Sequence, residues 1–265
     1  MRYITQKNRA ILREMVATDF KIRYQGSVLG YVWSVLKPLL LFGVLYVLFT
    51  YIFPMSKGVP HYGVSLLLGI VCWNFFAETT MIGASSVVSR GDLLRKVAIP
   101  RYLVVIASSV SALINMGLSM AVVLVFTLLN GVFPQWSWLM VPFVMLELFI
   151  LALGVAFILA TAYVKFRDIT YIWEVMLQVG FYASAIILPL EGLASKLHKW
   201  FFLNPIVQII QDARHFLINS TNDITLWGAQ LSVTRKLLPF FLIALICTFG
   251  FFYFRRRSPY FAEDI

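Results

Sequence analysis

Six long apolar runs divide the sequence, and their length limits what the chain can fold into. They cover residues 31–53, 62–82, 103–130, 138–164, 172–190 and 237–254. A helix needs about 20 apolar residues to cross about 30 Å of hydrocarbon, so each run is long enough to span a bilayer. We therefore predict an all-α, polytopic membrane protein with six transmembrane helices, formed by residues 1–265 as a single domain.

Composition agrees with this fold class. The chain is 60% apolar and 13% charged, whereas a soluble domain is about 45–50% apolar and about 25% charged. A soluble enzyme is therefore excluded. The first 30 residues are polar and basic, and the run that follows is far longer than the core of a signal peptide, so we expect it to remain as a membrane span.

The positive charges are distributed unevenly about the predicted spans. Seven lie within residues 1–37, four within 90–101, two within 165–167 and three within 255–257, while the other six, including Arg214, lie on the opposite side. Because cytoplasmic loops carry the excess of Lys and Arg, both termini are predicted to be cytoplasmic. The net charge of +10 then reflects topology and anionic lipid, and it requires no nucleic acid as a partner.

Residues 1–30 carry apolar side chains at helical spacing, interleaved with cations. Ile11 and Met15 are four residues apart, with Arg9 and Arg13 between the apolar positions. This pattern predicts a basic amphipathic helix in the inner membrane interface. Such a helix is either a lipid anchor or a lever between a cytoplasmic partner and the first span.

A second basic amphipathic segment joins the second and third runs, at residues 90–101. Leu93, Leu94 and Val97 are predicted to share one face of a two-turn helix, with Arg95 and Lys96 turned away from it. Pro100 requires the helix to end there. The segment is either a lipid-facing elbow or a docking site that inserts its apolar face into a cleft while its cations meet acidic side chains.

The connection between the last two runs contains an apolar stretch at residues 200–210 that is too short to cross the membrane. We predict a re-entrant or interfacial helical element on the extracellular side, broken by Pro205.

Acidic and aromatic residues within the runs are candidates for a transport path. Glu78, Glu147 and Glu174 each need water or a partner inside a bilayer. Aromatic and polar residues recur at helical spacing on three runs, which gives the path candidates Phe42, Tyr46, Phe49, Phe53, Trp73, Phe76, Glu174, Gln178, Phe181 and Tyr182. Aromatic faces pack against pyranose rings, as a sliding sugar polymer requires, but ordinary helix packing also uses such residues.

The sequence lacks the patterns of a catalytic or metal site. Its three histidines, His61, His198 and His215, have no matched cysteine or carboxylate, and Cys72 and Cys247 both lie in apolar runs. It also lacks a glycine-rich phosphate loop. We predict no metal and no cofactor on this chain, so that any ATP is bound by a separate chain.

Four segments carry a family resemblance. They are residues 23–33 followed by 37–39, residues 94–101, residues 166–169, and residues 203–206 with 212–214. In this order they resemble permease subunits of ABC-2-type exporters of polysaccharide and teichoic acid. The chain looks most like wall teichoic acid translocation permeases, with O-antigen and capsular polysaccharide exporters as the alternative.

The resemblance implies a homodimer in the bacterial plasma (inner) membrane, with two ABC ATPase subunits that bind ATP and Mg beneath it. The cargo would be an anionic glycopolymer linked to a polyprenyl diphosphate. The exporter would act in cell wall biogenesis. The residues implied in ATPase coupling are Asp92, Leu93, Leu94, Arg95, Lys96, Val97, Arg101, Arg167 and Asp168. Arg23 and Lys37 are candidates for the lipid diphosphate, although their cytoplasmic position explains them equally well.

Two other functions stay open at this stage. A gradient-driven carrier would use Glu78, Glu147 or Glu174 as proton or cation sites, but it predicts inverted repeats, which the sequence does not show. An integral-membrane lipid enzyme would need paired carboxylates facing the headgroups.

Overall fold

The computed structural model describes residues 6–24, 32–53, 59–96, 99–187, 190, 200–218, 225–226 and 232–261. Within these residues the chain is helical and contains no strand. The all-α prediction is therefore confirmed for the described part of the chain.

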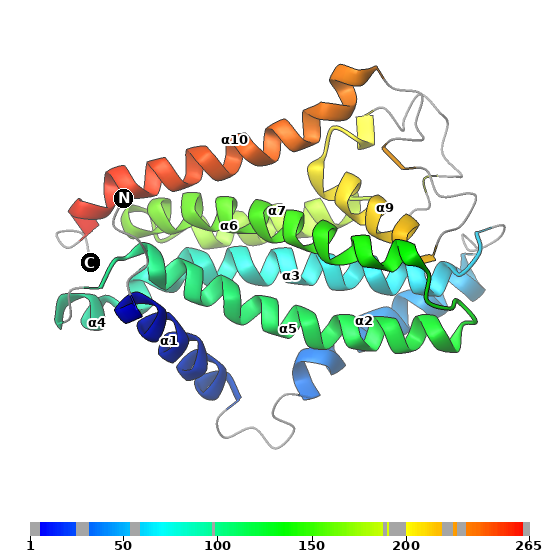
Figure 1. The fold of residues 1–265 in the computed structure, drawn as a ribbon, viewed down its shortest axis with the longest axis horizontal. Helices are drawn as coiled ribbons and strands as arrows, with labels where there is room; N and C mark the ends of the chain where they lie inside the picture. The colour runs from blue at the N-terminus through cyan, green and yellow to red at the C-terminus, as the bar shows by residue number, and fades with distance from the viewer. Residues whose placement is uncertain are drawn as a thin grey trace.

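The helices follow one another along the chain. Their bounds are α1 Gln6–Tyr24, α2 Val32–Val47, the π-helical turn η1 Leu48–Ile52, α3 Tyr62–Ser89, α4 Gly91–Lys96, α5 Tyr102–Leu129, the short helix η2 Trp136–Met140, α6 Val141–Lys165, α7 Ile169–Ala183, α9 Pro205–Ile218, α10 Val233–Arg257 and η4 Ser258–Tyr260. Figure 1 shows that α3, α5, α6, α7 and α10 run lengthwise through the molecule.

Five helical stretches of the described residues are long and apolar enough to cross a membrane. They are Val35–Ile52, Tyr62–Ser89, Tyr102–Leu129, Trp136–Lys165 and Val233–Tyr260. The predicted fifth span at 172–190 is not among them, because α7 has 15 residues and ends at Ala183. At 1.5 Å per residue it is about 22 Å long, shorter than the hydrocarbon core. The six-span count stays a prediction.

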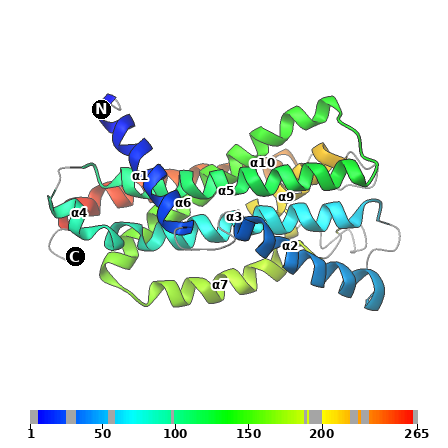
Figure 2. The same ribbon diagram turned by 90° about the horizontal axis from the view of Figure 1, so that it is seen from below.

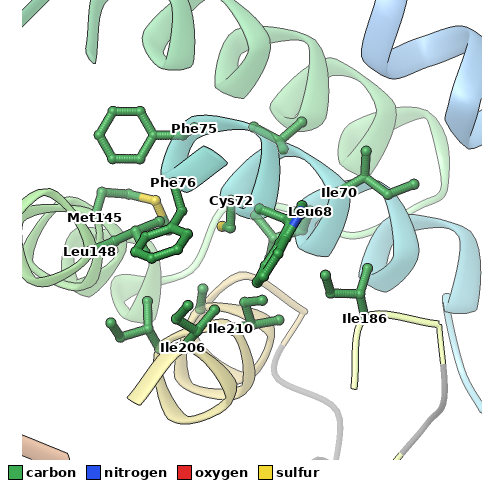
Figure 3. Close-up of a cluster of buried hydrophobic side chains, with 14 of the residues drawn as sticks. Leu68, Ile70, Cys72, Phe75, Phe76, Met145, Leu148, Ile186, Ile206 and Ile210 are labelled. Atoms are coloured by element: carbon green, nitrogen blue, oxygen red, sulfur yellow. The ribbon is translucent and has the colours of Figure 1, made fainter. Parts of the chain in front are cut away.

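Helix α3 lies at the centre of the bundle. It packs against α2, α5, α6, α7 and α9. Of its 18-residue apolar stretch, 72% is buried, compared with 22% for the stretch in α10 and 6% for the stretch that contains α2. In the core shown in Figure 3, Ile206 and Ile210 of α9 join Phe76 of α3 and Met145 and Leu148 of α6. The short helix α9 is therefore part of the core.

The start of α9 differs from the prediction for residues 200–210. Pro205 is the first residue of a helix that continues to Ile218, so it does not break the element. Proline is tolerated in the first helical turn because its missing N–H would have no intrahelical partner there. The Asn204 side chain accepts a hydrogen bond from the Ile206 backbone N–H at 3.0 Å, which supports the same helix start.

Helices α6 and α10 approach closely where two glycines face each other. A Cβ built on Gly250 would lie 2.3 Å from the Gly154 carbonyl oxygen, and one on Gly154 would lie 2.7 Å from the Cys247 Cα. Small residues allow membrane helices to pack backbone against backbone in this way.

Gly250→Ala is therefore expected to lower the thermal stability of the purified protein. Alanine is favoured over glycine in a helix by about 1 kcal/mol, but separating two backbones costs about 1–3 kcal/mol, and a contact at 2.3 Å lies at the costly end. Gly117→Ala on α5 is the matched control, because a Cβ there meets nothing within 4 Å. Equal melting temperatures for the two variants would show that the approach is not tight.

One end of the bundle gathers the chain termini and α4. Figures 1 and 2 both place α1, α4 and the C-terminal end of α10 at this end, and the connection between α6 and α7 is there too. The positively charged segments predicted to be cytoplasmic thus share one end of the molecule. Their orientation relative to the two membrane faces stays a prediction.

Candidate functional site

Helix α4 forms a corner between α3 and α5 at the end that carries the termini. Its Leu94 is half-buried and packs against two apolar clusters, one around Val87 and Val105 and one around Met15 and Val104. Leu93 is 40% exposed. The two leucines therefore do not share a face as predicted, because consecutive helical residues are about 100° apart. Val97 lies outside the described residues.

The charged residues of α4 point away from the bundle. Asp92, Arg95 and Lys96 are exposed, whereas Leu94 holds the helix to the core. In the turn between α6 and α7, Arg167 and Asp168 are exposed as well, and the Arg167 guanidinium lies 5.5 Å from the centre of the Tyr163 ring. The charged coupling residues predicted on α4 and in this turn therefore share one end of the molecule, and their side chains are exposed.

Two arginines connect the α4 corner to α1 and η4. Arg90, which follows α3, forms a salt bridge with Asp19 of α1, and both side chains are about one-fifth exposed. Arg101, which precedes α5, donates a hydrogen bond to the backbone carbonyl of Ser258. A displacement of α4 would therefore be passed to α1 and to the end of α10, as well as to α3 and α5.

Exchanging the charges tests whether the contact between Asp19 and Arg90 connects α1 to this corner. Asp19→Arg and Arg90→Asp should each destabilise the protein by about 1–2 kcal/mol, and the double exchange should recover at least half of the summed loss, because it restores an ion pair. Melting temperatures of the purified variants measure this. Glu14→Arg, at an exposed position of α1, serves as the control. Additive losses in the double variant would mean that the two residues act independently.

The predicted path residues of α7 and α3 fall into two groups. Glu174, Gln178 and Tyr182 are exposed on the outer face of α7, while Trp73 of α3 is buried, 6% exposed. Phe181 is half-buried and meets Trp73, with ring centres 6.2 Å apart.

Buried aromatic rings join α3 to α7. The centres of Phe76 and Trp173 are 6.3 Å apart, and the indole N–H of Trp173 donates to the Thr80 hydroxyl at 2.9 Å. Gly180 makes room for this packing, since a Cβ there would lie 2.7 Å from the Trp73 ring. Trp73 and Phe76 thus hold the helices together in the single chain, and the exposed face of α7 is left as the path candidate.

The aromatic stripe of the first span runs from the core to the surface. Phe42 is buried and contacts Phe126 edge to face, with ring centres 5.4 Å apart. Tyr46 and Phe49 are half-buried, and Phe53 is 57% exposed.

Of the two diphosphate candidates, only Lys37 can be placed. Its side chain is exposed on α2, at the start of the first span. The side chain of Arg23 lies outside the described part of the chain.

The three acidic residues differ in their surroundings. Glu78 accepts a hydrogen bond from the Asn115 side chain at 2.8 Å, and Glu174 is exposed. Glu147 shares the Gln208 amide N–H group with Asp212, at 3.5 and 2.7 Å. Two of the acids proposed for a gradient-driven carrier thus have side-chain partners within the same chain.

Asp212 is a buried acid that sequence reasoning did not single out for chemistry. Burial raises the pKa of its carboxyl above the ordinary value, and the hydrogen bond from Gln208 offsets part of that rise. The polar cluster of Gln208, Asp212 and Glu147 therefore joins α9 to α6 within the core.

Arg214 is another functional candidate that the sequence analysis missed. The charge pattern places it among the cations opposite the cytoplasmic side, but its side chain is buried on α9 and is 5% exposed. Its guanidinium donates to the carbonyls of Ser65 at 3.1 Å, Ala185 at 3.2 Å and Ile186 at 2.7 Å. Gly69 leaves room for it, because a Cβ there would lie 3.0 Å from the nearest guanidinium nitrogen.

Arg214 thus joins α9, α3 and the chain that leaves α7. The only sequence signal was the motif 212–214, which carried part of the family resemblance.

Comparison with known proteins identifies the family. Residues 12–217, from α1 into the last turn of α9, match the family described as ABC-2 type transporter. The chain belongs to the ABC-2 type transporter family. This ABC-2 match confirms the family resemblance found in the sequence, and it covers α4, α7 and α9 with their candidate site residues.

Three relatives of this ABC-2 chain are named as O-antigen export system permease protein RfbA. The one from Myxococcus xanthus is 31% identical, over 76% of this chain and 78% of the relative. Two from Klebsiella pneumoniae are 27% and 25% identical, over 77% and 76% of this chain and 78% and 77% of the relatives. All three names describe permease proteins.

Proposed function

We propose that this chain is the permease subunit of an ATP-driven exporter that carries an O-antigen polysaccharide, on a polyprenyl diphosphate, across the bacterial inner membrane. The similarity to three relatives named for O-antigen export, over about three quarters of each chain, supports this cargo. The teichoic acid cargo preferred from the sequence has no such support. The motifs behind that preference are shared by exporters of both polymers, so they did not distinguish between them.

The proposed drive comes from two separate ATPase subunits, which would bind ATP and Mg. In this proposal they contact α4 through Arg95 and Lys96, whose side chains are exposed, while the half-buried Leu94 keeps α4 attached to the bundle. Because Arg90 and Arg101 connect the same corner to α1 and η4, a push on α4 would reach the helix ends together. The corner is suited to transmit force because its outer side is charged and its inner side is packed.

The proposed path lies between two copies of the chain. α2 and α7 lie along the same side of the molecule in Figure 2, and each exposes a broad face in the single chain. On α7 this face mixes Glu174 and Gln178 with the aromatic ring of Tyr182. Hydroxyl-bonding groups beside an aromatic ring suit a sugar polymer, which must be held by many weak contacts in order to slide.

The experiment that tests the cargo is deletion of the gene followed by analysis of the polymer that accumulates inside the cell. We expect a lipid-linked polysaccharide of O-antigen type to build up in the cytoplasmic leaflet and to disappear from the surface, with both effects reversed by the restored gene. Accumulation of a polyol phosphate polymer, or normal surface polysaccharide, would contradict the proposal.

The path is tested separately, in cells that express only the variant permease. Gln178→Ala with Tyr182→Ala should slow export and leave binding of the ATPase unchanged, because both side chains are exposed on α7. Leu118→Ala with Val125→Ala, at exposed apolar positions of α5, is the matched control. Equal export by the two double variants would remove α7 from the path.

A further inference from the structure

An apolar groove of about 360 Å³ lies between α5, α6 and η2, in the half of the bundle away from α4. The residues of its wall on which the argument depends are Met116, Gly117, Met120, Trp138, Met145 and Leu217. None of the described residues that line it is charged.

The surroundings of the groove are apolar, as a surface in contact with hydrocarbon would be. α5 and α6 are both candidate membrane spans, and apolar side chains next to the groove are exposed on each of them. Leu118 is 40% exposed on α5, and Phe143 is 65% exposed on α6. A surface of this composition within a bilayer faces lipid chains. The exposed face of α7 differs, because it carries Glu174 and Gln178.

We propose that this groove binds one acyl chain of a bilayer phospholipid. Apolar cavities of about 150 Å³ in proteins stay dry and accept apolar guests. Water is therefore a poor occupant of this apolar groove, and an apolar molecule is a better one. Three of its wall residues are methionines, whose flexible side chains adapt to guests of irregular shape. A Cβ built on Gly117 meets nothing within 4 Å, so the wall is open at that position.

The favourable free energy of acyl-chain binding comes from van der Waals packing. Lipid chains are as apolar as the groove, so no hydrophobic force drives association within the membrane. An empty groove, however, forfeits the dispersion contacts of every atom that lines it, and a chain lying in it restores them. A groove with adaptable walls therefore holds an acyl chain longer than the flat helix surface beside it.

The bound chain lies beside a joint between two helices. The Trp138 indole N–H of η2 donates to the Leu217 carbonyl of α9 at 2.9 Å, and both residues line the groove. The acyl chain would thus pack beside this joint between η2 and α9. This inference does not depend on which polymer the protein exports.

A photoreactive lipid tests the proposal. The full chain is reconstituted in vesicles of phosphatidylethanolamine and phosphatidylglycerol that contain a phosphatidylethanolamine with a diazirine on one acyl chain. After illumination, mass spectrometry maps the labelled residues. We expect Met116, Met120 and Met145 to be labelled in preference to Leu118 and Val125. Even labelling of all five, or crosslinks between two copies of the chain through the groove, would overturn the proposal.

Variants at Gly117 provide the matched test. Gly117→Phe places a ring in the groove and should remove most of the labelling of Met120. Two control variants should retain this labelling. Gly117→Ala fills little space, and Leu118→Phe adds the same ring outside the groove. Gly117→Leu replaces the phenylalanine variant if that protein does not fold. Unchanged labelling in the filled variants would overturn the proposal.

Discussion

Replacing both Arg95 and Lys96 by glutamate is expected to abolish ATP-driven export while the permease itself folds normally. Both side chains are exposed on α4, so their replacement removes no contact from the core. Placing like charges opposite each other in an interface costs several kcal/mol, and each 1.4 kcal/mol is tenfold in affinity. Two reversals should therefore weaken binding of the ATPase by more than about a hundredfold.

Co-purification of the ATPase with the variant permease measures this effect, and export in cells measures its consequence. Arg255→Glu with Arg256→Glu is the matched control, because these exposed cations lie at the same end of the bundle, on α10. Undiminished ATPase binding in the α4 variant would contradict the proposed drive. Equal losses in both variants would mean that general positive charge, and not α4, attracts the partner.

The second large effect is expected at Arg214. Arg214→Met removes a buried guanidinium that donates to three backbone carbonyls. A hydrogen bond from a charged donor contributes about 1.5–3 kcal/mol, and a buried acceptor without a donor carries its own penalty. The loss should therefore reach about 3–5 kcal/mol, a large part of the about 5–15 kcal/mol by which a folded protein is stable.

The yield of monodisperse protein and its melting temperature measure the loss at Arg214. Arg214→Lys should recover only part of the stability, since an ammonium group cannot reach all three carbonyls with the planar geometry of a guanidinium. Arg235→Met, at an exposed cation of α10, should behave like the unchanged protein. Normal stability of Arg214→Met would show that the three carbonyls do not depend on the guanidinium.

Five of the six apolar runs correspond to candidate spans, and the largest difference in a boundary among these five has a clear cause. The second run was predicted to end at residue 82, yet α3 continues to Ser89. Residues 83–89 are small or β-branched, and three serines among them donate back to carbonyls of the preceding turn, Ser85 to Ile82, Ser86 to Gly83 and Ser89 to Ser86. Their hydroxyls are satisfied within the helix, so hydropathy underestimates its length.

Tertiary contacts explain what the sequence did not reveal about the site. The spacing of Trp73 and Phe76 predicted an aromatic stripe, but it gave no indication that α7 would cover these rings. Arg214 seemed an ordinary cation in an extracellular segment, because the carbonyls it satisfies are 28 to 149 residues away in the chain. The exposed cations of α4, by contrast, belong to a local pattern of charge that the sequence displays directly.

The most direct test of the central proposal is to place a photocrosslinking amino acid at position 93 of the intact complex in membranes. Leu93 is exposed on α4, and position 125 on α5, also exposed, serves as the control. We predict that position 93 crosslinks to an ATPase subunit and position 125 only to lipid. Labelling of a Leu93→Cys variant by an impermeant thiol reagent added from outside the cell, or crosslinks to lipid alone while export continues, would contradict it.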